Sequence, residues 1–180
     1  SSSAPPLSVT GPASPLPASP AAGASLSPDS VSPLSSCAVV GFCWGAAITA
    51  RILAWDSPPI PVVGGVGFHP SLHPNAAGRA LVGSVTKPFV LAPAGNDPPA
   101  LHPGGEFAEA IRAKFGDEVG GLPLLAPFPS MLHGWMTRGP LDDPAIAAAY
   151  QDGLALTTRF FRAVSGTPPA HHLRPPESRA

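Results

Sequence analysis

The residues with the clearest chemical potential surround a cysteine at position 43, in the stretch GFCWG of residues 41–45. A short apolar run, residues 37–42, leads to this cysteine, and helix-forming residues follow it. Where a strand passes into a helix through one residue, the positions two before and two after press together, so only small side chains fit. Gly41 and Gly45 therefore predict a nucleophile elbow, and a buried structural cysteine is the alternative interpretation.

An elbow would make Cys43 reactive. Its side chain would stand clear of the sheet at the amino end of the following helix, where backbone N–H groups and the helix dipole favour negative charge. Such surroundings lower the pKa of a thiol and produce the nucleophilic thiolate. The N–H of Trp44, the next residue, could then stabilise an oxyanion during acyl transfer.

Two more residues could complete a catalytic group. Asp97 follows the predicted strand FVLAPAG, and His133 follows the predicted strand LPLLAPF. In open α/β sheets, ligands bind at the carboxyl ends of the strands. A nucleophile, then an acid, then a histidine is the chain order of an α/β-hydrolase triad. The alternatives are a turn aspartate before Pro98 and a histidine that serves only its loop.

Apolar runs and helical patterns alternate along the middle of the chain. Strands are predicted at residues 37–42, 60–68, 87–92 and 122–127, and helices at residues 44–55, 105–115 and 143–164. The pair Asp143-Pro144 begins the last helix, and Gly166 ends it. This alternation predicts an α/β fold with a mostly parallel sheet and flanking helices.

Composition narrows the possible functions. The chain has 180 residues, 44% hydrophobic content and a net charge of −1, with ten scattered Lys and Arg residues. This charge and hydrophobic content do not indicate a nucleic-acid or membrane partner. Cys37 and Cys43 do not form a disulfide framework or a zinc spacing, so we expect reduced thiols and a cytoplasmic protein. We expect no cofactor and no metal; His171 and His172 lack a third ligand nearby.

Both ends of the chain differ from its middle. Residues 1–36 are rich in Ser, Pro and Ala and are predicted to be disordered, as is the tail of residues 167–180. A linker or non-native sequence is a better explanation of the first segment than a transit peptide, because the first basic residue is Arg51. The predicted folded domain is therefore residues 37–166.

Four motifs in this order resemble the dienelactone hydrolase family of α/β-hydrolases, and its eukaryotic members in particular. They are GFCWGA at 41–46, FHPS at 68–71, PAGNDP at 93–98 and HGWMTRG at 133–139. The resemblance covers residues 37–164. It implies a small ester or lactone substrate, with Cys43 as the nucleophile, His133 as the general base and acid, and Asp97 as the residue that orients His133.

Two further residues lie in these motifs. Arg138 could meet a substrate carboxylate, or it could be an arginine on a surface loop. His69 is interpreted as a structural or loop residue rather than a member of the site.

The chain departs from the family before the elbow. Several strands and helices precede the elbow in the family, whereas here a Ser/Pro/Ala segment does. We therefore expect a partial α/β-hydrolase fold without its N-terminal strands, and without the loop that supplies a second oxyanion N–H. The strand at 37–42 would then be an edge open to self-association. Two functions follow: a hydrolase, poor as this chain alone, or a non-catalytic remnant.

Overall fold

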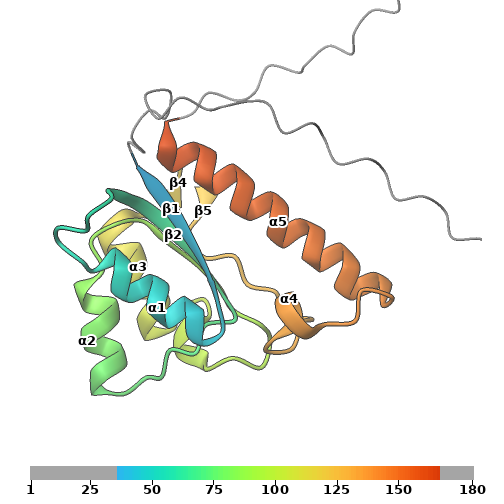
Figure 1. Ribbon diagram of the computed structural model, residues 1–180. Coiled ribbons are helices and arrows are strands. Elements are labelled where there is room, and N and C mark those ends of the chain that lie inside the picture. Colours follow the sequence, from blue (N-terminus) through green and yellow to red (C-terminus); the bar gives the residue numbers. More distant parts are fainter. Residues whose placement is uncertain (1–35, 167–180) are drawn as a thin grey trace, which may run out of the picture. The chain divides into compact units, whose positions relative to one another are not determined.

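A three-stranded parallel sheet forms the centre of the structure, a computed structural model that describes residues 36–166 (Figure 1). The strands are β1 (Cys37–Phe42), β2 (Val62–Phe68) and β3 (Phe89–Ala92), in the order β1-β2-β3. The predicted α/β class with a parallel sheet is confirmed. The predictions for residues 1–35 and 167–180, including disorder and His171 and His172, lie outside the described residues.

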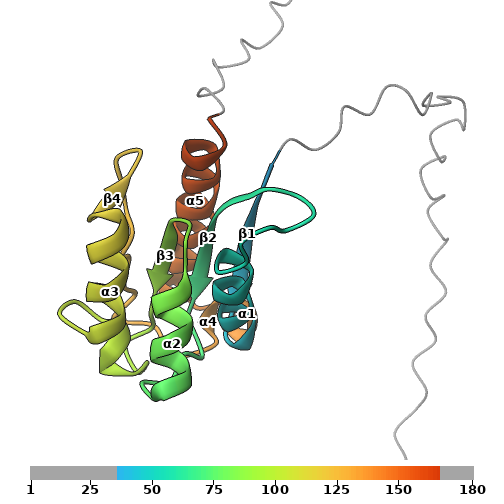
Figure 2. The ribbon, with the colours of Figure 1, turned by 90° about the vertical axis from the view of Figure 1, so that its left-hand side faces the viewer.

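Helices cover both faces of the sheet. Helix α1 (Trp44–Leu53) and helix α2 (Ala76–Ser84) lie on one side, with α3 (Glu106–Phe115) next to α2, and α5 (Pro144–Ser165) lies on the other side (Figure 2). Helices α1 and α5 reach the sheet directly, since both contact β1 and β2. The predicted helices at 44–55, 105–115 and 143–164 match α1, α3 and α5 closely.

Glycines in β2 allow the two layers of helices to approach this closely. A Cβ on Gly64 would lie 3.0 Å from the ring of Phe160 in α5, whereas a Cβ on Gly65 would lie 2.7 Å from Thr49 in α1. Successive strand residues point to opposite faces of a sheet. Both layers of helices therefore pack directly on strand β2, and Phe68 at its end is fully buried.

The last helix begins and ends as its sequence predicts. The Asp143 carboxylate accepts hydrogen bonds from the N–H groups of Ala145 and Ile146, and Pro144 occupies the first turn. Gly166 closes the helix with a φ of 65°, a left-handed conformation that glycine adopts without strain. Within residues 36–166, no helix combines the length and the apolar character needed to cross a bilayer.

The predicted fourth strand at 122–127 is largely wrong. Only β5 (Leu122–Pro123) is a strand, and it pairs antiparallel with β4 (Glu118–Val119). The rest of the segment runs beside β3 through isolated parallel bridges at Leu91–Leu125 and Ala94–Phe128. The prolines at 123, 127 and 129 lack the N–H groups that a continuous ladder needs. The segment still reaches the same end of the sheet as β3.

Besides β4, three short elements were not predicted. Helix α2 begins at a cap in which the Asn75 side chain accepts a hydrogen bond from the N–H of Gly78. Its apolar positions are too few, and its glycines too many, for a clear helical pattern. The other two are the 3₁₀ turn η2 (Pro99–Leu101) and the single-turn helix α4 (Trp135–Arg138).

Packing of α5 on the sheet gives a testable prediction. Phe160→Ala should lower the free energy of unfolding by about 3–5 kcal/mol, because it opens a cavity opposite Gly64. Leu154→Ala, on the same helix but 41% exposed, should cost less than about 1 kcal/mol. Urea unfolding followed by tryptophan fluorescence measures both. Equal losses would contradict the packing of α5 through Phe160.

Candidate active site

Cys43 is a one-residue turn between a strand and a helix. Strand β1 ends at Phe42 and helix α1 begins at Trp44, so Cys43 alone changes the chain direction. Its φ is 53° and its ψ is −120°, a strained conformation for a residue with a side chain. The Cys43 N–H donates to the Phe68 carbonyl at 3.1 Å, which ties the turn to the end of β2.

The two glycines around Cys43 differ in what they allow. A Cβ on Gly41 would collide with the Gly45 carbonyl oxygen and the Thr49 hydroxyl, so the prediction that only a small residue fits there is confirmed. A Cβ on Gly45 would meet no atom of the described chain within 4 Å, so the same prediction for Gly45 is wrong. Position 45 contacts Gly41 through its backbone carbonyl, and any other residue at position 45 would have the same carbonyl.

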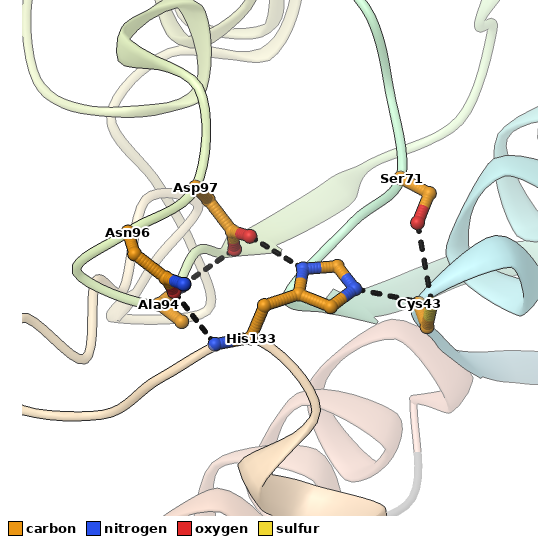
Figure 3. Close-up of polar contacts among 6 residues, drawn as sticks. All are labelled: Cys43, Ser71, Ala94, Asn96, Asp97 and His133. Carbon is orange, nitrogen blue, oxygen red and sulfur yellow. Dashed lines mark hydrogen bonds and ion pairs between the residues drawn. The ribbon is translucent and has the colours of Figure 1, made fainter.

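The structure brings together the three residues singled out from the sequence (Figure 3). The His133 Nε2 lies 3.1 Å from the Cys43 Sγ, and the His133 Nδ1 lies 2.6 Å from the Asp97 Oδ1. The Asp97 side chain is almost completely buried, whereas that of His133 is 28% exposed. The imidazole therefore bridges a buried carboxylate and a thiol, an arrangement suited to proton transfer.

Backbone and side-chain hydrogen bonds hold Asp97 and His133 in place. The Asp97 Oδ2 accepts the Ala94 N–H at 2.7 Å, which fixes the carboxylate in the turn after β3. The Asn96 Oδ1 accepts the His133 N–H at 2.6 Å, which fixes the loop that carries the imidazole. Sequence analysis assigned no role to Asn96, although its place beside Asp97 at a strand end was a signal.

A second side chain reaches the sulfur. The Ser71 Oγ lies 3.3 Å from the Cys43 Sγ, and the Ser71 N–H donates to the Cys43 carbonyl at 3.0 Å (Figure 3). Ser71 belongs to the FHPS motif, but sequence analysis gave it no function. Its position just past the carboxyl end of β2, the strand next to β1, was the available signal.

His69 lies at the site rather than away from it. Its side chain is fully buried, and its ring centroid is 5.0 Å from that of His133. Neither ring nitrogen has a hydrogen-bond partner among the described residues. Burial lowers the pKa of His69, and the nearby charge of His133 lowers it further. The His69 imidazole that packs against His133 is therefore uncharged at neutral pH.

Electrostatics favour charge separation between the thiol and the imidazole. The pKa of Cys43 is lowered from 9.0 to about 7, chiefly by the hydrogen bonds from Ser71 and His133 and also by the Trp44 N–H, against an opposing effect of burial. Burial lowers the pKa of His133, but the hydrogen bonds and charges of Asp97 and Cys43 outweigh it and raise the pKa overall. A thiolate–imidazolium pair is therefore favoured near neutral pH.

A pocket opens beside the imidazole. Its volume is about 430 Å³, and its lining includes His133, Arg138, Leu132, Trp135, Pro140 and Ile146. Arg138 ends helix α4 and is exposed, and its guanidinium lies over Gly134, where a Cβ would collide with it. Trp44, the residue after Cys43, is 70% exposed. The described residues contain no cluster of three or more His, Cys, Asp or Glu side chains that could hold a metal.

Comparisons with known proteins add no assignment, since no family model, no curated protein and no solved structure matches the chain. The geometry and the four motifs are therefore the basis for any functional proposal.

The elbow contact predicts opposite effects for two similar substitutions. Gly41→Ala should lower the free energy of unfolding by about 1–3 kcal/mol, because its methyl group would push β1 away from α1. Gly45→Ala should raise stability by up to about 1 kcal/mol, because alanine favours the first turn of α1 and meets no obstacle. Urea unfolding curves measure both variants. A tolerated Gly41→Ala would contradict the close contact.

The lowered pKa of Cys43 predicts its reaction with iodoacetamide. The thiolate is the reactive form, so the rate should fall as pH drops, with a midpoint of about 7. His133→Ala should move this midpoint upward, because the imidazole hydrogen bond and charge are lost.

A matched control is available in Cys37, the other free and partly buried thiol. Cys37, measured in Cys43→Ala protein, should react much more slowly at pH 7 than Cys43 measured in Cys37→Ala protein. Equal rates would show that the elbow does not activate its thiol.

Proposed function

We propose that this chain is a hydrolase of the dienelactone hydrolase type, which cleaves small esters or lactones through Cys43. The observation that carries the proposal is the continuous contact from the Asp97 carboxylate through the His133 imidazole to the Cys43 sulfur at a strand–helix turn. The four motifs that resemble the family support it, and a partial α/β-hydrolase fold is part of the same proposal.

Acylation begins when the His133 Nε2 takes the thiol proton, while the Nδ1–H donates to Asp97. The Cys43 sulfur attacks the carbonyl carbon, a C–S bond forms, and the carbonyl electron pair moves to oxygen. In this proposal the Trp44 N–H, which also helps to lower the pKa of the thiol, donates to that oxyanion. When the oxyanion collapses, the C–O bond breaks and His133 gives its proton to the departing alkoxide.

Deacylation repeats these steps with water. The His133 Nε2 takes a proton from water, whose oxygen attacks the thioester carbon. The C–S bond then breaks, its electron pair returns to sulfur, and the acid product leaves. Asp97 keeps the imidazole in one tautomer throughout, because its buried carboxylate accepts only from the Nδ1 side.

The surroundings of the triad suggest the substrate class. Arg138 and His133 line the same pocket of about 430 Å³, so an ester or lactone with a free carboxylate would place its anion near the guanidinium. The exposed side chains of Trp44 and Leu132, which adjoin the two reacting residues in sequence, suit an apolar carbon skeleton. The free thiols of Cys37 and Cys43 suit the reducing cytoplasm that we propose as its location.

One observation favours the alternative of a non-catalytic remnant. Within residues 36–166, strand β1 pairs only with β2, so the strand that carries the elbow is a sheet edge. An unpaired edge lets a strand fray, and a loose elbow would not hold a substrate in place. The same edge supports the proposal that chains associate through β1.

Hydrolysis of p-nitrophenyl acetate tests the proposal. We expect a burst of about one nitrophenolate per chain as Cys43 is acylated, followed by slow turnover as water hydrolyses the thioester. Cys43→Ala should abolish both phases, and Asp97→Asn should slow the burst by at least about 100-fold.

Two controls accompany this assay. Cys37→Ala and Asp142→Asn remove the same chemical groups at positions outside the triad, and both should leave the burst unchanged. A Cys43 that alkylates readily but gives neither burst nor turnover would identify the chain as a remnant with an intact elbow.

A further inference from the structure

The Cys43 sulfur has two polar side chains against it, and the triad uses only one of them. His133 approaches from the loop after the segment beside β3, whereas Ser71 approaches from the loop after β2. The sulfur therefore lies between an imidazole nitrogen at 3.1 Å and a hydroxyl oxygen at 3.3 Å (Figure 3).

Ser71 is held in this place by the backbone. At one end of residues 68–71 the Phe68 carbonyl accepts the Cys43 N–H, and at the other end the Ser71 N–H donates to the Cys43 carbonyl. Between them, His69 has a φ of 36° and donates its N–H to the Ala92 carbonyl, so the chain bends around the elbow. Three hydrogen bonds thus tie one short segment to Cys43, counting the one between the side chains.

The direction of the Ser71 hydrogen bond follows from proton transfer. Once the His133 Nε2 has taken the thiol proton, the sulfur has no hydrogen left and is only an acceptor. The His133 imidazolium donates one hydrogen bond to the sulfur, and the Ser71 hydroxyl, whose oxygen lies 3.3 Å from it, can then act only as a second donor. A donor to a charged acceptor gives a stronger hydrogen bond than one between neutral groups.

We propose that Ser71 is a positioning residue that donates its hydroxyl hydrogen bond to the Cys43 thiolate and thereby holds the ion pair with His133 ready for attack. The inference rests on the proposed role of Cys43 as a nucleophile. Ser71 keeps its own proton throughout the reaction. Its hydrogen bond weakens when the sulfur pair enters the C–S bond, and it returns when that bond breaks in deacylation, so Ser71 assists sulfur both before attack and as a leaving group.

This arrangement involves two opposing effects that can be measured. A hydrogen bond from Ser71 increases the thiolate fraction at low pH, in line with the lowered pKa of Cys43. It also makes each thiolate less nucleophilic, because nucleophilicity falls with pKa with a Brønsted slope of about 0.4–0.5. Loss of the hydroxyl should therefore slow the reaction at low pH and accelerate it at high pH.

Other charged groups around the site stay the same when only Ser71 is changed. His133 contacts the sulfur directly, and Asp97 contacts the other ring nitrogen of His133. The remaining titratable or charged neighbours are the His69 ring packed on His133, Arg138 beside Gly134, and Arg51 and His73, which line a groove of about 210 Å³ together with Ser71 and Trp44. A comparison among Ser71 variants holds all of them constant.

The test is the rate of Cys43 alkylation by iodoacetamide from pH 5 to pH 10, in a Cys37→Ala background. Ser71→Ala should raise the midpoint by about one pH unit. One unit reduces the thiolate fraction tenfold at low pH and raises intrinsic reactivity about threefold. The Ser71→Ala rate should thus be about threefold lower below pH 6 and about threefold higher above pH 9, so the two curves cross.

Two controls separate the hydroxyl from the fold. Ser71→Thr retains the hydroxyl and should follow the parent curve. Ser84→Ala removes an exposed hydroxyl that donates to the Leu81 carbonyl, and it should also follow the parent curve. Absorbance at 240 nm, which reports the thiolate, should show the same shift for Ser71→Ala alone.

Two results would overturn the inference. Superimposable curves for the parent and Ser71→Ala would make the hydroxyl a bystander, and an equal loss of rate at every pH would make its role structural. The outcome is separate from that of the proposed function, because alkylation needs no turnover. Crossing curves in a chain that does not hydrolyse esters would retain the Ser71 role and reject the hydrolase.

Discussion

The close approach of strand β1 and helix α1 at Gly41 is the constraint on which the candidate site depends. Because Gly41 has no side chain, the Gly45 carbonyl and the Thr49 hydroxyl lie directly against it. Thr49 donates to the same carbonyl at 3.1 Å, which steadies the first turn of α1. The helix can therefore begin one residue after the strand ends, and Cys43 has to accept a positive φ. That strain directs the sulfur toward the loops that carry its partners.

Strand β2 extends this constraint to the rest of the fold. Gly64 and Gly65 admit α5 and α1 on opposite faces, so the sheet and both helices form one packed unit. The end of β2 then serves the site, because the Phe68 carbonyl binds the elbow N–H and the next three residues bend around Cys43. Packing in the core and positioning of the thiol are thus consequences of the same strand.

Sequence patterns predicted the elements that depend on local chemistry. The apolar run at 37–42 and the Asp143–Gly166 caps of the last helix were sufficient to locate β1 and α5. The same was true of the positions of Cys43, Asp97 and His133, because each follows a strand or a segment that runs beside one.

Interactions that depend on tertiary structure were not predictable. The contact of Ser71 with Cys43 joins residues from two different loops, and no local pattern encodes it. The burial of His69 beside His133 is likewise a result of chain folding. The segment at 122–127 has the apolar content of a strand, but its prolines leave only isolated bridges to β3. The error at Gly45 came from expecting both positions to need a small side chain, whereas residue 45 enters the close contact through its carbonyl.

The two partners of the sulfur differ in how far along the chain they lie from it. Ser71 is 28 residues from Cys43, whereas His133 is 90 residues away. Loop-closure entropy grows with the logarithm of loop length, so the longer closure costs about 1 kcal/mol more. The pairing of β1 with β2 is sufficient to bring Ser71 to Cys43. His133 reaches Cys43 only when β3 and the segment beside it are also in place. During folding, the thiol should therefore be enclosed by Ser71 first and should acquire its base last, which delays reactivity until the sheet is complete.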